Sequence, residues 1–242
     1  MLKPAAGAKQ FTLILPDDRA LVWGLHTEIV KTISMETDGI DSLASDNALR
    51  PADFLSIDAQ GAELLILEGA SKMLKDVTTG VVCEVEFAEL YEEQPLFQDT
   101  AARLKKDHFR LCEIFNQQYF NTSPAYPSVQ GRGFLTVGEA LFLRESGFWL
   151  GDAEGNLKPE NVIKCLKLAA VAVAFDQLDY AMDICRRLEK SGLISLSAAA
   201  EQTNVKYVKL LSDLLHAVDS QSNLKPSLEL PEDQPPAQER LN

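Results

Sequence analysis

Residues 53–87 constrain the fold of this chain more than any other stretch, because they read as strand, turn, helix, turn and strand. Residues 54–57 form a short apolar run, and after Gly61 the apolar residues fall at helical spacing. Residues 81–87 then predict a second strand. Two strands joined by one helix of this length predict a parallel βαβ unit and an α/β fold, with ligands gathering at the carboxyl ends of the strands.

The same stretch opens an ordered motif that continues to residue 97. It reads ID.QGAE…L.GA…L, followed by EV.F..LYE.QPLF, and resembles the carboxyl-terminal half of FkbM-type methyltransferases, which use S-adenosylmethionine. The resemblance extends over residues 33–144, although Ser56 stands where the family often has a lysine. The matching residues are Ile57, Asp58, Gln60, Gly61, Ala62, Glu63, Leu67, Gly69, Ala70, Glu84, Phe87, Leu90, Tyr91, Glu92, Gln94, Pro95, Leu96 and Phe97.

The amino-terminal half of such a domain has no counterpart in the sequence. Before Asp53 the chain has Gly7, Gly24 and Gly39, and no two of them have the GxG spacing of a cofactor loop. The resemblance therefore implies an incomplete Rossmann-like methyltransferase sheet, with residues 54–57 at its edge and the cofactor-binding residues unknown. Three alternatives stay open: the hairpin of residues 11–25 covers this edge, a protein partner or second copy covers it, or an upstream segment supplies the cofactor site.

Carboxylates at the ends of the two predicted strands are the candidates for catalysis. A carboxylate there can orient a substrate hydroxyl or accept its proton, so Asp58 and Glu84 are the predicted catalytic residues. A structural role competes with this one, since Asp58 could cap the following helix for about 0.5–2 kcal/mol. Glu84 lies within an apolar strand and needs a partner there, and repulsion from Asp58 would raise one of the two pKa values.

Four further residues are implied in substrate binding by the family motif: Gln60, Glu63, Tyr91 and Gln94. Glu63 could instead interact with the positive end of the predicted helix, and Tyr91 could be a packed aromatic residue at the rim. No histidine has a second histidine or cysteine at ligand spacing, so no metal site is predicted.

Composition limits the classes of partner. A formal charge of −13 and a pI near 4.7 argue against binding to nucleic-acid phosphates or anionic membranes. The first ten residues lack the apolar core of a secretory signal, and the longest apolar run, residues 168–175, is too short to span a bilayer. The four cysteines form no CxxC pair and are expected to be reduced core residues. A cytoplasmic location is expected.

Three parts are expected along the chain: a partial methyltransferase domain at 1–146, a helical extension at 157–218 and a disordered tail at 219–242. The tail contains four prolines among polar residues. The first helix pair of the extension is weakly similar to a tetratricopeptide pair. Besides the βαβ unit, the patterns predict strands at 11–15, 20–25, 27–34, 109–115 and 134–144, helices at 42–47, 97–107, 159–175, 178–191 and 197–218, and a long loop at 116–133.

Two functions are compatible with these features. The first is an S-adenosylmethionine-dependent methyltransferase that transfers a methyl group to a hydroxyl of a small molecule or saccharide near Asp58 and Glu84, with activity of this chain alone left open. The second is a non-catalytic, degenerate methyltransferase domain that binds a protein through its helices. The missing glycine loop favours the second function, whereas the intact Asp58, Gly61, Glu63 and Glu84 favour the first.

Overall fold

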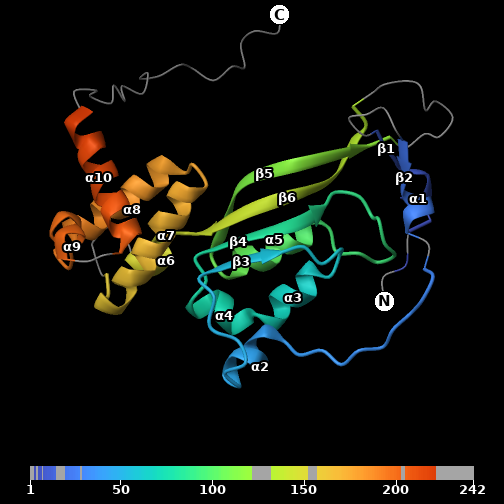
Figure 1. The fold of residues 1–242 in the computed structure, drawn as a ribbon, viewed down its shortest axis with the longest axis horizontal. Coiled ribbons are helices and arrows are strands. Elements are labelled where there is room, and N and C mark those ends of the chain that lie inside the picture. Colours follow the sequence, from blue (N-terminus) through green and yellow to red (C-terminus); the bar gives the residue numbers. More distant parts are fainter. Residues whose placement is uncertain are drawn as a thin grey trace, which may run out of the picture.

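The computed structural model describes residues 3, 5–6, 8–14, 20–27, 29–121, 132–151, 157–202 and 205–221. Its centre is a four-stranded sheet in the order β3-β4-β6-β5 (Figure 1). β3 (Phe54–Ile57) and β4 (Gly80–Glu86) are parallel, whereas β6 (Phe134–Arg144) is antiparallel to β4 and to β5 (Phe109–Phe120). The predicted α/β class and the predicted βαβ unit are confirmed, and β3 is an edge strand of the described sheet.

The helix between β3 and β4 is broken into α3 (Glu63–Gly69) and α4 (Ser71–Asp76), where one continuous helix was expected. Close packing accompanies the break, because a Cβ atom at Gly69 would lie 3.3 Å from the Cα atom of Gly39. Two glycines therefore let the two backbones approach. The glycine of the GA motif is thus explained by packing against the segment that leads into α2 (Ile40–Ser45).

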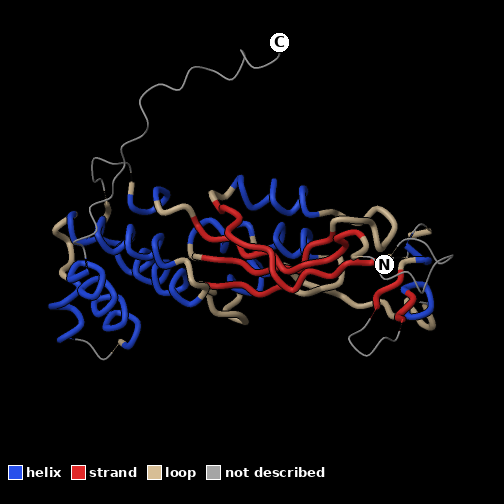
Figure 2. Tube along the Cα trace, turned by 90° about the horizontal axis from the view of Figure 1, so that it is seen from above, coloured by secondary structure: helices blue, strands red, loops and turns tan. Residues whose placement is uncertain are grey.

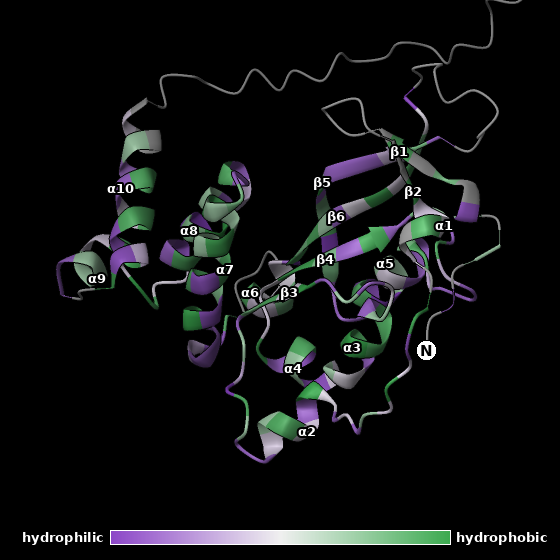
Figure 3. Ribbon diagram, turned by 45° about the vertical axis from the view of Figure 1, so that its right-hand side comes forward, coloured by the Kyte–Doolittle hydropathy of each residue, from purple (hydrophilic) through white to green (hydrophobic). Residues whose placement is uncertain are grey.

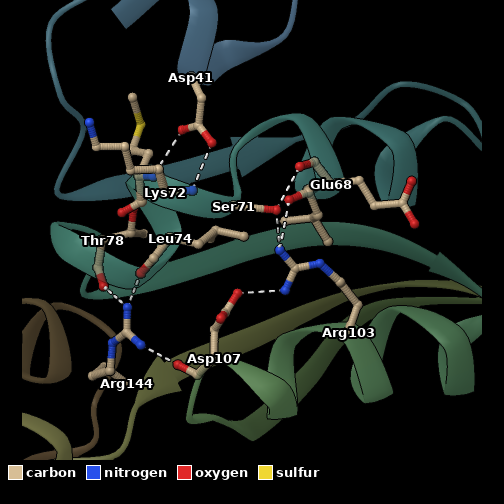
Figure 4. A network of polar contacts seen from close by, with 11 residues as sticks. Asp41, Glu68, Ser71, Lys72, Leu74, Thr78, Arg103, Asp107 and Arg144 are labelled. Atoms are coloured by element: carbon tan, nitrogen blue, oxygen red, sulfur yellow. Dashed lines mark hydrogen bonds and ion pairs between the residues drawn. The ribbon is translucent and has the colours of Figure 1, made fainter. Parts of the chain in front are cut away.

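Asp41 of α2 caps the amino-terminal end of α4, the helix that begins after the break. Its carboxylate accepts hydrogen bonds from the backbone N–H groups of Lys72 at 2.7 Å and Met73 at 2.9 Å (Figure 4). These are among the first N–H groups of α4, which have no partner within the helix. The predicted helix at 42–47 is confirmed as α2, and its acidic residue has a structural role.

Each face of the sheet packs against a different set of helices. Alternate residues of β4, such as Val81 and Cys83, contact α3, α4 and α5 (Phe97–Lys106) in one hydrophobic cluster. Val82 lies in a second cluster, which extends into the carboxyl-terminal helices. The helical extension lies at one end of the sheet and the amino-terminal hairpin at the other (Figures 1 and 2).

The helical extension comprises α6 (Gly147–Leu150), α7 (Val162–Ala174), α8 (Leu178–Lys190), α9 (Leu196–Gln202) and α10 (Lys206–Gln221). The helix expected at 197–218 is two helices. α8 and α10 carry hydrophobic and hydrophilic residues together, as amphipathic helices do (Figure 3). An ion pair of 2.8 Å between Lys167 and Asp53, and a ring stack of 5.4 Å between Phe175 and Phe54, join α7 to β3. Most of the expected disordered tail, residues 222–242, lies outside the described residues.

The amino-terminal segment departs most from expectation. β1 (Thr12–Ile14) and β2 (Ala20–Val22) form a separate two-stranded sheet, and the expected strand at 20–25 ends in helix α1 (Trp23–His26). The hairpin packs near β5, so it does not cover the edge of β3. Within 27–34 the described residues form no strand, because β-branched side chains without a neighbouring strand have no ladder to join.

β5 also differs from expectation, because it continues to Phe120 into the stretch expected to be a loop. Its register with β6 shifts twice beyond Phe115, and Asn116 has a φ angle of 49°. Such bulges allow a polar strand to continue while bending. Residues 122–131 of the expected loop lie outside the described residues.

Arg144, the last residue of β6, joins the turns that precede β4 and β5. Its guanidinium, which is fully buried, donates to the backbone carbonyls of Leu74, Thr78 and Asp107 (Figure 4). The cation also lies 4.1 Å from the centre of the Phe109 ring. One side chain therefore links the α4–β4 turn to the α5–β5 turn. Within the described ranges, no helix is both long and apolar enough to cross a membrane.

Candidate functional site

The side chains of Asp58, Gln60 and Glu84 meet at the carboxyl ends of β3 and β4. The amide nitrogen Nε2 of Gln60 donates to Asp58 Oδ1 and to Glu84 Oε2, each at 3.0 Å. The parallel pairing sets this arrangement, because Ile57 lies opposite Cys83 and so places the following residues of the two strands side by side. The structure thus brings together both predicted catalytic residues and one predicted substrate-binding residue.

Glu84 is half-buried, and its environment disfavours the charged form. Burial, and then the carboxylate of Asp58, raises the pKa of Glu84 to about 7. Asp58 is exposed and stands beside it. A carboxyl group that titrates near neutral pH can both release and accept a proton under physiological conditions, which is the property required of a general acid or base.

Glu63 shapes the turn that carries this site. Its carboxylate accepts the backbone N–H groups of Ala59 at 2.7 Å and Gly61 at 2.9 Å, and its side chain is buried. Gln60 and Gly61 have φ angles of 55° and 96°, so the turn is left-handed at both positions. The predicted substrate-binding role of Glu63 stays a prediction, and the contacts of its carboxylate are with the turn itself.

Three carboxylates lie close enough to hold a cation. Oxygen atoms of Asp58, Glu63 and Glu84 lie within 4.8 Å of one another. The Gln60 amide already donates to two of these residues, and Glu63 accepts two backbone N–H groups. We therefore describe the cluster as three carboxylates that accept hydrogen bonds from the turn and from Gln60, and assign no metal ion to it.

The comparison with protein families supports the resemblance carried by these residues. Residues 5–111 match the family model described as methyltransferase FkbM domain. The FkbM-type resemblance is confirmed. The match begins earlier than the expected residue 33 and ends within β5, before β6. Neither the curated proteins nor the solved structures that were searched gave a match. The described sheet and its helices are consistent with a Rossmann-like methyltransferase fold.

The loop of the FkbM motif that follows β4 is stabilised by hydrogen bonds between its own residues. The Oε1 atom of Gln94 accepts the backbone N–H groups of Leu90 and Tyr91, each at 3.1 Å, and Gln94 is 5% exposed. This predicted substrate-binding residue therefore supports the loop. Tyr91 is half-buried, and its pKa is raised by burial first and then by Glu84 and other carboxylates.

Sequence reasoning missed Glu86. It is 4% exposed, and burial, followed by Glu63 and Glu84, raises its pKa to about 8. The signal was present in the sequence, because Glu86 follows Glu84 by two residues and so shares a face of the same strand. The FkbM motif gives no position to this residue, whereas the structure places its carboxyl in a buried environment that disfavours the charged form.

Glu139 was also missed, because it comes from a strand distant in sequence. It lies directly opposite Glu84 in the antiparallel pair of β4 and β6 and adds to the raised pKa of Glu84. Its Oε1 atom accepts a hydrogen bond of 2.7 Å from Asn116 on β5. Polar side chains therefore form a row that runs from Asp58, which follows β3, across β4 and β6 to Asn116 on β5. Only the register of β6 could have revealed this row.

The described residues do not fit a complete site for the methyl donor. Gly61 follows β3, but it lies in a turn closed by Glu63, and no earlier parallel strand with a glycine-rich turn occurs within the described ranges. A Rossmann-like donor site needs such a turn for close approach of the backbone. We therefore assign no residue of this chain to S-adenosylmethionine.

Proposed function

We propose that the Asp58–Gln60–Glu84 site binds the acceptor of an O-methyl transfer and receives the proton of its hydroxyl group. The observation that carries the proposal is the amide bridge at the carboxyl ends of two parallel strands, within the segment that matches the FkbM methyltransferase domain. S-adenosylmethionine, which the family resemblance implies, would supply the methyl group. The acceptor would be a small molecule or a saccharide without strong negative charge, because the site is acidic.

The proposed roles of the two carboxylates differ. Asp58 is exposed, so an acceptor hydroxyl can reach it directly and donate to it. Glu84 is half-buried and titrates near neutral pH, so it can hold a proton beside Asp58 and pass it on. Gln60 fixes the distance between the two groups. A positioned general base of this kind contributes roughly 10²–10⁴ in rate.

The open edge of β3 suggests how a complete enzyme would be formed. An exposed edge offers unpaired backbone groups to another strand. We propose that a protein partner or a second copy of the chain pairs with this edge, and that donor binding depends on that assembly. Sedimentation of the purified chain, alone and with co-purified partners, tests this part.

The central experiment is calorimetric titration of S-adenosylmethionine and its demethylated product into the purified chain, and into any complex that it forms. The chain or complex that binds the donor is then incubated with labelled S-adenosylmethionine and a panel of neutral sugars and hydroxylated small molecules. Asp58→Asn and Glu84→Gln should each lower methyl transfer by about 10²-fold or more. Glu68→Gln, an exposed acidic residue on α3, is the matched control and should retain the rate.

A non-catalytic interaction module is the second candidate, and the lack of a described glycine-rich turn favours it. Absence of donor binding by the chain and by its complexes would overturn the enzymatic proposal and support this one. The helices α7–α10 would then be the first surface to test for a protein partner.

A further inference from the structure

The turn that follows β3 is closed by one buried carboxylate. Glu63, the first residue of α3, is 3% exposed. Its Oε1 atom accepts the backbone N–H of Ala59 at 2.7 Å, and its Oε2 atom accepts the backbone N–H of Gly61 at 2.9 Å. Both oxygens act as acceptors, as those of an ionised carboxylate do, and such charge-assisted hydrogen bonds are among the stronger ones in proteins. One side chain therefore fixes the backbone on both sides of Gln60.

Gln60 needs this support, because its backbone conformation is uncommon. Its φ angle is 55° and that of Gly61 is 96°. A non-glycine residue keeps a left-handed conformation only where the surrounding contacts hold it there. The exposed side chain of Gln60 then reaches the carboxylates, with Nε2 lying 3.0 Å from Asp58 Oδ1 and 3.0 Å from Glu84 Oε2. The conformation of the turn thus determines where the amide lies.

The structure also separates the roles of the two acidic residues of the turn. The sequence allowed Asp58 to cap the following helix, but α3 begins after Ala62 without a side-chain cap. The Asp58 carboxylate accepts a hydrogen bond from Gln60 instead. Glu63 is the acidic residue whose carboxylate accepts the backbone N–H groups before the helix. Glu63 therefore has the structural contacts, and Asp58 is left exposed at the site.

We propose that Glu63 is a positioning residue of the candidate site, which accepts the N–H groups of Ala59 and Gly61 and thereby holds the Gln60 amide between the site's carboxylates. This role differs from the substrate contact that the family motif implies. Glu63 acts through Gln60, so its loss should resemble loss of the Gln60 amide. The catalytic meaning of the inference rests on the proposed function, whereas the placement of Gln60 can be measured without methyl transfer.

The test locates the Gln60 side chain by NMR in labelled protein, with Gln60→Ala to assign its amide signals. In the wild type, the Nε2 protons should give nuclear Overhauser cross-peaks to the side chain of Glu84 and should exchange slowly with water. Glu63→Gln offers one acceptor oxygen in place of two, and Glu63→Asp keeps the charge on a shorter side chain. Both should abolish the cross-peaks and accelerate exchange. Glu68→Gln, an exposed acidic residue of the same helix, is the matched control and should retain both signals.

Kinetics provide a second readout wherever the chain or its complex transfers methyl groups. Displacing a group of the site by about 1 Å can cost roughly 10²-fold in rate, so Glu63→Asp should lower transfer by up to about that factor. Adding Glu63→Asp to Gln60→Ala should lower the rate no further, because both changes remove the same amide bridge. A merely structural role of Glu63 would lower stability and leave the Gln60 cross-peaks in place.

Unchanged Gln60 cross-peaks in folded Glu63→Asp and Glu63→Gln would overturn the proposal. If neither variant folds, hydrogen exchange in the wild type decides, because the N–H groups of Ala59 and Gly61 should be protected by the buried carboxylate. Exchange at the rate of open loop amides would overturn the proposal, whereas protection together with the Gln60 cross-peaks would support it. Failure of donor binding would refute the proposed function and leave these NMR results standing, so the two failures are distinguishable.

Discussion

Gln60 and Glu84 are 24 residues apart in sequence, yet Gln60 Nε2 lies 3.0 Å from Glu84 Oε2. The contact exists because β3 and β4 are parallel and end side by side. Gln60 adopts a φ angle of 55°, which non-glycine residues rarely do, and this directs its amide between the two carboxylates. A rare backbone conformation is thus maintained where it joins the two predicted catalytic residues.

The raised pKa of Glu84 predicts a specific pH dependence of stability. Glu84 titrates near 4.5 in the unfolded chain and at about 7 in the folded protein, so the folded state binds the proton more tightly. Its contribution to stability is complete below about pH 4.5 and is lost as the pH rises through about 7. Glu84→Gln is permanently neutral, so above pH 7 it should be more stable than the wild type by about 1 kcal/mol, a figure reduced for solvent screening.

Urea unfolding at pH 4 and at pH 8 measures this difference. The two proteins should unfold at similar urea concentrations at the lower pH and diverge at the higher one. Glu68→Gln on the exposed face of α3 should follow the wild type at both pH values. A Glu84→Gln variant that is less stable than the wild type at pH 8 would show that the carboxylate is well solvated in the folded protein.

Neutralising Glu86 should stabilise the fold more than neutralising Glu84, and at a higher pH. It is 4% exposed with a pKa of about 8, so its ionisation costs folding free energy in mildly alkaline solution. Glu86→Gln should raise the free energy of unfolding at pH 9 by on the order of 2 kcal/mol, and should change it little at pH 4. Thermal unfolding followed by circular dichroism across this range checks the expectation. A constant difference between the two proteins at all pH values would contradict it.

Much of the fold could be predicted from the βαβ stretch because its period, its turn residues and its strand ends agree with one another. The carboxyl ends of β3 and β4 follow from parallel pairing alone, which is why Asp58 and Glu84 could be named. The break between α3 and α4 could not, since it depends on a contact between Gly39 and Gly69 that no local pattern reveals. Glu139 likewise depends on register with a distant strand.

The amino-terminal segment was least predictable for a related reason. Its β-branched residues favour strands, but a strand forms only where a neighbour supplies backbone partners. Here residues 29–39 are exposed and form neither helix nor strand, whereas Trp23 begins helix α1 and packs on Tyr91. In both cases the outcome depends on whether a tertiary contact is present, and not on strand propensity.

Among the described basic residues, we expect substitution of Arg144 to lower the stability of the fold most. Arg144→Met would leave the carbonyls of Leu74, Thr78 and Asp107 without this donor in a buried region. Each unsatisfied group costs about 1–3 kcal/mol, so a total loss of about 3 kcal/mol or more is expected. Urea unfolding measures it.

Two further arginine variants bracket that result. Arg144→Lys keeps the charge but lacks the planar fork that reaches several carbonyls, so an intermediate loss is expected. Arg110→Met, at a side chain that is 78% exposed, should change stability by less than about 0.5 kcal/mol. Equal stability of Arg144→Met and the wild type would contradict the assigned role.

The last prediction concerns Asp41, which caps α4 and is not one of the carboxylates of the candidate site. Its carboxylate accepts the N–H groups of Lys72 and Met73 from another helix, so Asp41→Ala should lower stability by about 1–2 kcal/mol. Asp38→Ala, an exposed aspartate just before α2, is the control and should have little effect. Hydrogen exchange should accelerate at the Lys72 and Met73 amides in Asp41→Ala alone. Unchanged exchange at both amides would contradict a protective cap by Asp41, and would leave packing against Gly39 as the interaction that stabilises the break after Gly69.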